Sequence, residues 1–253
     1  MAVLKADNLE KSFNRRLVVK GVTIEIHSGE IIGLLGRNGA GKTTTFQMMM
    51  GLLKPDRGHI WLDEKDISGY STSQRAIAGV TYLPQEDSVF LNTSVENNLK
   101  MILEIQNYDK KEQGKIKQHL LHDMGLEKLA KQSAHSLSGG ERRRLEISRS
   151  LILDPKFLLL DEPFTGIDPL TILELQKILL GLKQKGIGII LSDHNVKDTL
   201  KITDTAYIID EGEILIRGKP KEIAENDIAR ERFLGKNFKL GEERTLHLPL
   251  DKM

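Results

Sequence analysis

The pattern of apolar and polar positions in the first fifty residues predicts strands followed by a helix. The segment VTIEIH alternates apolar and polar residues, as a half-buried strand does, and a Ser-Gly turn leads into the apolar run EIIGLLG, which ends at Gly36. The residues from Lys42 to Met50 favour a helix, which Gly51 would end. Strand, glycine-rich loop and helix in this order form the context that a phosphate-binding loop requires.

The middle of the chain is more polar and has helical patterns. From about residue 88 the sequence becomes polar, with the helical patterns ENNLKMILEIQ and KEQGKIKQHLLHDMGL. Strand patterns return at FLLLDEP and GIGIILSDH, on either side of an amphipathic helix. We therefore expect an α/β core into which a helical subdomain, about residues 88–150, is inserted.

The remaining third of the chain predicts a short helix, two strands and further helix. The strands are expected in TAYIIDEGEILIRG, around a Glu-Gly turn, and the helix in PKEIAENDIARERFL. The last residues, GEERTLHLPLDKM, have no clear periodicity. We thus expect one domain over residues 1–240 and a mobile tail over 241–253.

Composition changes this picture mainly by exclusion. The net charge of +1 gives no reason to expect a nucleic-acid partner. No apolar run approaches the roughly 18 to 20 residues that span a bilayer, so we expect a cytoplasmic protein that does not insert into the membrane. The absence of cysteine excludes disulfides and thiolate chemistry.

The clearest motif, GRNGAGKT, matches the pattern G-x-x-x-x-G-K-[ST] in full. Glycines let backbone N–H groups surround phosphates, Lys42 adds a positive charge, and the Thr43 hydroxyl is suited to ligate Mg²⁺. The alternative is a plain glycine turn at a helix start. The candidate nucleotide-binding residues here are Gly36, Arg37, Asn38, Gly39, Ala40, Gly41, Lys42, Thr43 and Thr44.

Two acidic residues follow the apolar strand FLLL. Asp161 ends the strand, where a carboxylate beside the phosphate-binding loop would hold Mg²⁺. Glu162 is one residue further and so points elsewhere, which suits a base that polarises the attacking water. The alternative is an acidic turn that caps the strand.

Two further residues complete the candidate hydrolytic set. The amide of Gln85 could contact both Mg²⁺ and the attacking water, although a loop glutamine is usually only solvated. His194 follows the strand GIGIILSD and is placed to reach the γ-phosphate or orient the water. Among the other histidines, His119 and His122 could share a helix face, but a solvated polar face is the favoured interpretation, and we expect no metal other than Mg²⁺.

A second anion-binding pattern occurs in SLSGGERRR. Ser138, Gly139, Gly140 and Glu141 would open a helix whose free N–H groups attract an anion. With the phosphate-binding loop, Gln85, LSGGE, Asp161-Glu162 and His194 in this order, the chain resembles the nucleotide-binding subunits of ATP-binding cassette (ABC) transporters. The resemblance implies a P-loop NTPase fold of the α/β class, with a parallel or mixed core sheet, an N-terminal antiparallel part and the inserted helical subdomain.

The same resemblance implies a mechanism. In that family two cassettes dimerise head to tail, and the LSGGE of one closes over the ATP held by the phosphate-binding loop of the other. It also suggests Phe13 as the aromatic ring that stacks on adenine, where many members have tyrosine, and Asp168 as part of the loop that links the two sites. Arg37 stands where proline is frequent.

At a finer level, the strings YLPQE, LSGGERRRLEI, LLDEPFTGIDP and SDHNV resemble the ATPases of lipopolysaccharide-export transporters. This implies a homodimer on the cytoplasmic face of the inner membrane that drives two transmembrane subunits, which would dock near Phe90 and Leu91. The alternative for Phe90 is a core anchor of the helical insertion. Arg142, Arg143 and Arg144 are either interface cations or a solvated helix face.

Other functions remain open at this point. Cassettes of branched-chain amino acid importers have similar sequences around the motifs, so a role in such an importer is the alternative. A soluble cassette acting in translation or DNA repair is disfavoured because the chain has one compact motif set and no heptad array. A catalytically inactive regulatory cassette is disfavoured because every motif residue is present.

Overall fold

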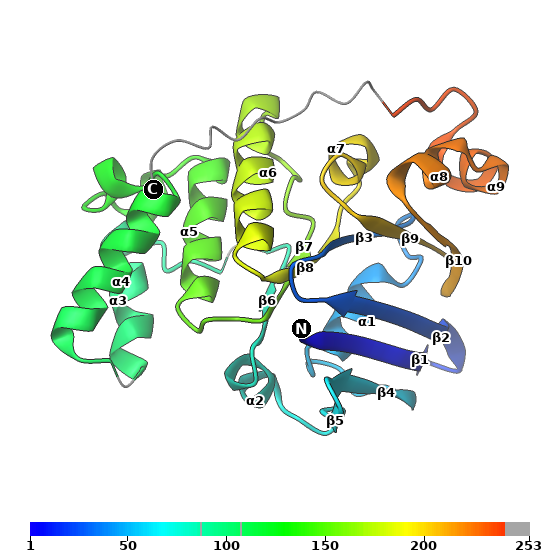
Figure 1. Ribbon diagram of the computed structural model, residues 1–253, viewed down its shortest axis with the longest axis horizontal. Coiled ribbons are helices and arrows are strands. Elements are labelled where there is room, and N and C mark those ends of the chain that lie inside the picture. Colours follow the sequence, from blue (N-terminus) through cyan, green and yellow to red (C-terminus); the bar gives the residue numbers. More distant parts are fainter. Residues whose placement is uncertain (87, 107, 241–253) are drawn as a thin grey trace.

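The computed structural model describes residues 1–86, 88–106 and 108–240, so the expected tail over 241–253 lies outside the described residues. Its strands form two sheets (Figure 1). The first is antiparallel, in the order β2-β1-β4-β5, with β1 (Val3–Phe13), β2 (Arg16–His27), β4 (Arg57–Leu62) and β5 (Lys65–Asp66). It confirms the expected N-terminal antiparallel part.

The second sheet is mixed and has the order β10-β9-β3-β8-β7-β6. Its strands are β3 (Ile31–Leu35), β6 (Val80–Leu83), β7 (Phe157–Asp161), β8 (Gly188–Ser192), β9 (Thr205–Asp210) and β10 (Glu213–Gly218). All neighbouring pairs are parallel except β9 and β10. The α/β fold class with a parallel core sheet is therefore confirmed.

The three central strands of this sheet are buried along their whole length. Each residue of β3, β7 and β8 is buried, as expected for parallel strands that are covered on both faces. Because the strands are parallel, their carboxyl ends meet at one edge, where Asp161 pairs with Ser192 in the register. Open α/β sheets bind ligands outside this edge.

Helices cover the sheet on both faces. They are α1 (Lys42–Met49), α2 (Thr72–Ile77), α3 (Val95–Ile105), α4 (Lys110–Asp123), α5 (Gly139–Leu151), α6 (Pro169–Gln184), α7 (Val196–Leu200), α8 (Pro220–Glu225) and α9 (Asp227–Ala229). Short 3-10 turns occur at Glu127–Leu129 and Ala134–Ser136, and a π-helical turn at Arg230–Leu234. None of the helices in the described ranges is long and apolar enough to cross a bilayer.

The helical insertion lies on one side of the molecule. In Figure 1, α3 and α4 are outermost, and α5 lies between them and α6. Leu99 of α3, Leu120 of α4 and Leu145 of α5 belong to the same hydrophobic cluster as Leu158 of β7. The insertion therefore shares a core with the sheet, and its boundary at residues 88–150 stays a prediction.

The C-terminal end of α1 is held by a buried arginine. Arg75 is fully buried, and its guanidinium donates hydrogen bonds to the carbonyl oxygens of Met48 at 2.7 Å, Met49 at 2.5 Å, Ser68 at 2.9 Å and Tyr70 at 3.1 Å. Burial lowers the pKa of Arg75 to about 10. A cation at this end of a helix satisfies its last carbonyls and complements the helix dipole.

Candidate functional site

The phosphate-binding loop connects β3 to α1 and is closed on one side and open on the other. A Cβ atom on Gly36 would lie 2.3 Å from the carbonyl oxygen of Ile209 on β9, so only glycine fits there. Gly39 has φ +77°, and a Cβ atom at this position would meet no heavy atom within 4 Å. Arg37 and Asn38 are exposed on the loop, and Thr43 is exposed in the first turn of α1. A backbone turn that is open on this side can receive an anion.

Lys42 brings a buried positive charge to the loop. The residue is only 6% exposed, and Nζ donates to the carbonyl oxygens of Gly36 at 2.8 Å and Arg37 at 3.1 Å. Burial lowers the pKa of Lys42, an effect that the negative charges of Glu162 and Asp161 partly oppose. In the described part of the chain no carboxylate forms an ion pair with this ammonium. The open loop and the unpaired cation fit a polyphosphate.

Asp161 ends β7 between two hydroxyl groups. Ser192 at the end of β8 donates to Oδ1 at 2.5 Å, and Tyr82 of β6 donates to Oδ2 at 3.3 Å. Burial and the neighbouring Asp161 raise the pKa of Tyr82, so its hydroxyl stays protonated and remains a donor. A carboxylate fixed in this way fits the oxygen ligands that Mg²⁺ prefers. The sequence did not reveal these partners, which are 31 and 79 residues from Asp161 in the chain.

Glu162 and His194 form a contact beside Asp161. Oε1 of Glu162 lies 2.6 Å from Nε2 of His194, while the Glu162 side chain is 8% exposed and the His194 side chain 43% exposed. Glu162 has φ +49°, a left-handed conformation that costs a non-glycine residue about 1–2 kcal/mol. The structure brings together the two residues that the sequence proposed for water activation.

Gln85 follows β6 and is exposed. It lines a pocket whose walls also include Gly139, Glu162 and Thr165. No residue of the phosphate-binding loop is among those that line this pocket in the described part of the chain. The structure thus brings Gln85 and Glu162 to the same pocket.

The LSGGE motif forms a complete N-terminal cap on α5. The Ser138 hydroxyl accepts from the backbone N–H of Glu141 at 3.3 Å, and Oε2 of Glu141 accepts from Ser138 N and Oγ, both at 2.8 Å. These bonds from Ser138 lower the pKa of the Glu141 carboxyl. Ser138 and Gly139 are exposed, whereas a Cβ atom on Gly140 would lie 2.0 Å from Cγ2 of Thr171. The exposed cap leaves the helix N-terminus accessible to an anion.

The remaining two proposed nucleotide contacts lie on separate elements. Asp168 caps α6: its carboxylate accepts from the Thr171 hydroxyl at 2.6 Å and from the N–H groups of Thr171 and Leu170, both at 3.1 Å, and these bonds lower its pKa. Phe13 ends β1 with 44% of its surface exposed, and the Lys11 ammonium lies 5.9 Å from its ring. An exposed ring face is available for stacking.

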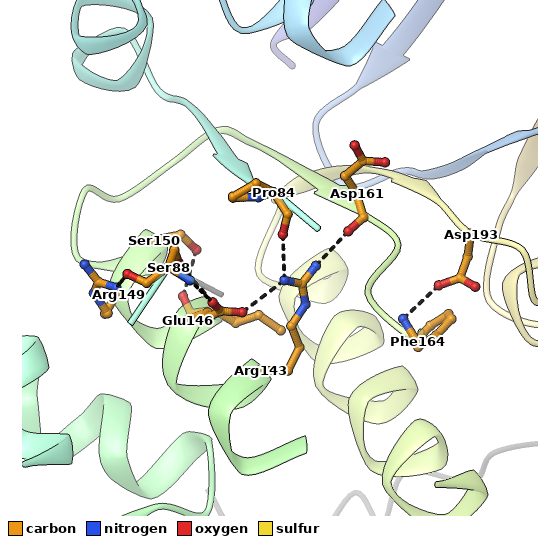
Figure 2. A network of polar contacts seen from close by, with 10 residues as sticks. Pro84, Ser88, Arg143, Glu146, Arg149, Ser150, Asp161, Phe164 and Asp193 are labelled. Atoms are coloured by element: carbon orange, nitrogen blue, oxygen red, sulfur yellow. Dashed lines mark hydrogen bonds and ion pairs between the residues drawn. The ribbon is translucent and has the colours of Figure 1, made fainter. Parts of the chain in front are cut away.

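Arg143 contradicts both interpretations that the sequence offered for it. It is 6% exposed and lies in the interior of the fold, where its guanidinium donates to the carbonyl oxygens of Pro84 and Asp161, both at 3.0 Å (Figure 2). It also pairs with the buried Glu146 at 3.0 Å. By contrast, Arg144 pairs with the exposed Glu174. Three identical letters in sequence gave no signal that one points inward.

Glu146 continues this network toward the segment that was proposed to contact membrane subunits. Its Oε1 accepts from the backbone N–H of Ser88 at 2.6 Å and from the Ser88 hydroxyl at 3.0 Å (Figure 2). Arg149 bonds the carbonyl oxygen of Ser88 and places its guanidinium 4.8 Å from the centre of the Phe90 ring. Phe90 is 50% exposed and so is not a core anchor, whereas Leu91 packs against the core.

The histidines of α4 are solvated, as expected. The side chains of His119 and His122 are 67% and 72% exposed, and their nitrogens lie 3.4 Å from Asp123 and 3.3 Å from Glu127, respectively. Within the described ranges, no group of three or more His, Cys, Asp or Glu side chains could hold a metal ion.

Comparison with known proteins gives consistent results. The family profile described as ABC transporter matches residues 19–165. The chain is 47% identical to the "Lipopolysaccharide export system ATP-binding protein LptB" of Acidithiobacillus ferridurans over 94% of this chain and 99% of that protein. It is 44% identical to the protein of the same description from Escherichia coli, over 95% of this chain and 100% of the other.

Solved structures agree. An ATP-binding cassette of an ABC transporter in its ADP conformation superimposes with a TM-score of 0.83 at 25% identity, over 93% of this chain and all of the other. A cassette from Clostridium perfringens, described as part of an ABC transporter complex, gives a TM-score of 0.81 at 31% identity, over 90% of this chain and 93% of that one. From its motifs, its fold and these matches together, the chain belongs to the ABC transporter family.

Proposed function

We propose that this protein is the ATP-hydrolysing subunit of a transporter that exports lipopolysaccharide from the inner membrane. The contact between Glu162 and His194 at 2.6 Å, at the same sheet edge as Lys42 and Asp161, carries the ATPase part of this proposal. The lipopolysaccharide part is supported by relatives of that description, which match at 43–47% identity over 94–95% of this chain.

Nucleotide binding begins at the open side of the loop. Backbone N–H groups of Gly36–Thr43 and the ammonium of Lys42 hold the phosphates, and Phe13 stacks on the adenine. Lys42 is already desolvated, so its charge acts at close range in a medium of low dielectric constant. Thr43, Asp161 and Gln85 would hold Mg²⁺, which supplies charge neutralisation to the β- and γ-phosphate oxygens.

Hydrolysis needs a base and a group that orients water. Glu162 polarises the attacking water, and this kind of catalysis is worth about 10²- to 10⁴-fold in rate. His194 donates from Nε2, either to Glu162 as in this structure or to the γ-phosphate once nucleotide is present. The pocket that includes Gln85 and Glu162 gives water a place beside the base.

A second chain completes the site. Ser138 and Gly139 are exposed at the start of α5, and no residue of the phosphate-binding loop shares the pocket that Gly139 lines. The free N–H groups and dipole of α5 therefore serve the ATP of the partner in a head-to-tail homodimer. Charge-assisted hydrogen bonds of this kind contribute about 1.5–3 kcal/mol each, so phosphate loss loosens the dimer.

The dimer acts at the cytoplasmic face of the inner membrane through two transmembrane subunits. The exposed half of Phe90 offers an apolar contact for a cytoplasmic helix of such a subunit. Glu146 and Arg143 connect the Phe90 segment to the strand that ends in Asp161. A displacement of the Phe90 segment would therefore be transmitted through these bonds to the strand end that carries Asp161.

The test is to purify the tagged protein from its native membranes in mild detergent and to identify what accompanies it by mass spectrometry. Lipopolysaccharide-export membrane subunits are expected. Amino-acid permease subunits would replace the proposed substrate with that of an importer, and ribosomal or repair proteins without a membrane partner would refute the transport role.

A reconstituted vesicle assay tests the ATPase role separately. The complex should release lipopolysaccharide in an ATP-dependent manner, and Glu162→Gln should bind ATP, lose turnover and accumulate as a dimer by light scattering. Normal turnover by Glu162→Gln would remove Glu162 from its proposed role.

A further inference from the structure

The loops that carry Glu162 and His194 are joined by consecutive hydrogen bonds. The backbone N–H of Glu162 donates to the carbonyl oxygen of Ser192 at 2.8 Å. The backbone N–H of Phe164 donates to Oδ2 of Asp193 at 2.7 Å, and Figure 2 shows this second bond. The first bond starts at Glu162 itself, and the second joins Phe164 to the residue directly before His194. The two loop-to-loop bonds therefore restrain the backbone from which both side chains of the Glu162–His194 contact extend.

Asp193 is the side chain in this arrangement that spans both loops. It is 1% exposed, and each carboxylate oxygen has a different partner: Oδ2 accepts from Phe164, and Oδ1 accepts from the backbone N–H of Asn195 at 2.8 Å. Asn195 in turn caps α7, because its side chain accepts from Asp198 N. The carboxylate therefore fixes the residue after His194 and the residue two positions after Glu162.

The backbone of Glu162 requires such a restraint. With φ +49° it occupies a region that is unfavourable for a side chain of its type, and a conformation of this kind persists only where the surroundings impose it. Ser192 restrains the N–H of Glu162 itself, and Asp193 restrains Phe164 on its other side. Without Asp193 the segment after Glu162 has one bond fewer to hold the left-handed turn.

We infer that Asp193 is a positioning residue for ATP hydrolysis, which holds Glu162 and His194 in the relative geometry needed to orient the attacking water. This inference rests on the proposed function of Glu162. It predicts that the carboxylate of Asp193 matters because it has two acceptor oxygens. An asparagine at this position has one acceptor oxygen and an NH₂ group, so one of the two N–H groups would face another donor.

The variant to test is Asp193→Asn, with Asp204→Asn as the matched control. Asp204 also accepts from a backbone N–H, that of Ile31 at 2.8 Å, and it precedes β9 at the opposite edge of the sheet from Glu162. Both changes remove a carboxylate that bonds the backbone, but only the first touches the Glu162 loop. ATPase turnover, KM for ATP and the melting temperature are measured for each in the transporter complex.

Asp193→Asn should lower kcat about tenfold to a hundredfold, as misplacement of a reacting group does, with KM for ATP changed less than about twofold. Asp204→Asn should keep kcat within about twofold even if its melting temperature falls. If Asp193→Asn does not fold, Asp193→Ser replaces it, since a hydroxyl still accepts one bond. A kcat for the folded variant within twofold of the unmodified protein, or an equal loss in Asp204→Asn, would overturn the inference.

A double variant separates positioning from general damage. If Asp193 acts through Glu162, Asp193→Asn should not lower further the residual rate of Glu162→Gln. A further drop of the same size as in the unmodified background would show that Asp193 acts elsewhere. If Glu162→Gln itself hydrolyses ATP normally, the proposed role of Glu162 fails, whereas an inactive Glu162→Gln beside an active Asp193→Asn defeats this inference alone.

Discussion

Nη2 of Arg143 donates a hydrogen bond at 3.0 Å to the backbone carbonyl of Asp161, so a residue of the LSGGE helix directly supports the strand end that carries the acidic pair. The same guanidinium donates to the carbonyl oxygen of Pro84, the residue directly before Gln85. Arg143 thereby connects three segments that the chain separates by 18 and 59 residues.

Removal of this guanidinium should destabilise the fold strongly. Arg143→Met leaves Glu146, which is 2% exposed, as a buried carboxylate without its cation, and the expected loss is about 3–5 kcal/mol in free energy of unfolding. Denaturant titration measures it. Arg144→Met is the control, because its partner Glu174 is 60% exposed and such pairs contribute about 1 kcal/mol or less.

The double variant Arg143→Met/Glu146→Leu should lose less free energy of unfolding than the two single variants lose together, since it leaves no unpaired buried charge. Additive losses would mean that the pair is not the source of the stability.

The start of α5 depends on glycine at one position only. Gly140→Ala should cost about 1–3 kcal/mol, because its Cβ atom would lie 2.0 Å from Cγ2 of Thr171 and that side chain is held by its bond to Asp168. Gly139→Ala has no comparable clash, since the nearest atom is 3.8 Å away, and should leave stability unchanged or slightly raised. Thermal melting distinguishes the two variants.

A rescue experiment checks the cause. Thr171→Ser removes the clashing methyl group and keeps the hydroxyl, so it should restore much of the stability lost in Gly140→Ala. No recovery in the double variant would place the strain elsewhere.

The capping box on α5 should make stability depend on pH. Hydrogen bonds from Ser138 hold the pKa of Glu141 below its ordinary value of 4.5 in the folded state. A depressed acid contributes stability above its unfolded pKa and loses it as the pH falls through the folded pKa. The melting temperature of Glu141→Gln should therefore be lower than that of the unmodified protein at pH 7, and the difference should vanish in acid below pH 4.5.

Glu104→Gln is the control for this titration, because Glu104 pairs with Lys100 on the exposed surface of α3. A constant difference for Glu141→Gln across the whole pH range would contradict the role of its charge in the cap.

Phe90 should matter for assembly and not for folding. Because half of its surface is exposed, Phe90→Ala should leave the melting temperature nearly unchanged, while binding of the isolated protein to its membrane subunits weakens about tenfold or more, as for an aromatic anchor. Ile105→Ala, at a residue that is 79% exposed on α3, should alter neither quantity. A large drop in melting temperature for Phe90→Ala would restore the core-anchor interpretation.

The sequence predicted those parts of the site that depend on local order along the chain. Asp161 is the last residue of a buried strand, and Lys42 and His194 come shortly after one. Because parallel strands bring their carboxyl ends together, motif and pattern were enough to predict that these residues share one edge of the sheet. The contacts of Ser192 and Tyr82 with Asp161 depend on which strands are neighbours, which no local pattern states.

Arg143 differs from its neighbours for a similar reason. Its burial depends on how α5 is rotated against the ends of β6 and β7. Three consecutive arginines do not show which of them faces the strands. The two interpretations of Phe90, a docking residue or a core residue, differ in the exposure of its side chain. The sequence does not give this exposure, because an apolar residue in a loop is compatible with both.

Arg75 has a consequence for what nucleotide binding must achieve. The guanidinium sits at the carboxyl end of α1 while the phosphates would approach the other end, so both charges act along the same helix axis in the favourable sense. Its buried bonds are shielded from salt, unlike those of a surface charge. We therefore expect the eight-residue α1 to keep its helical form without nucleotide, so that little of the binding free energy is spent on ordering the helix.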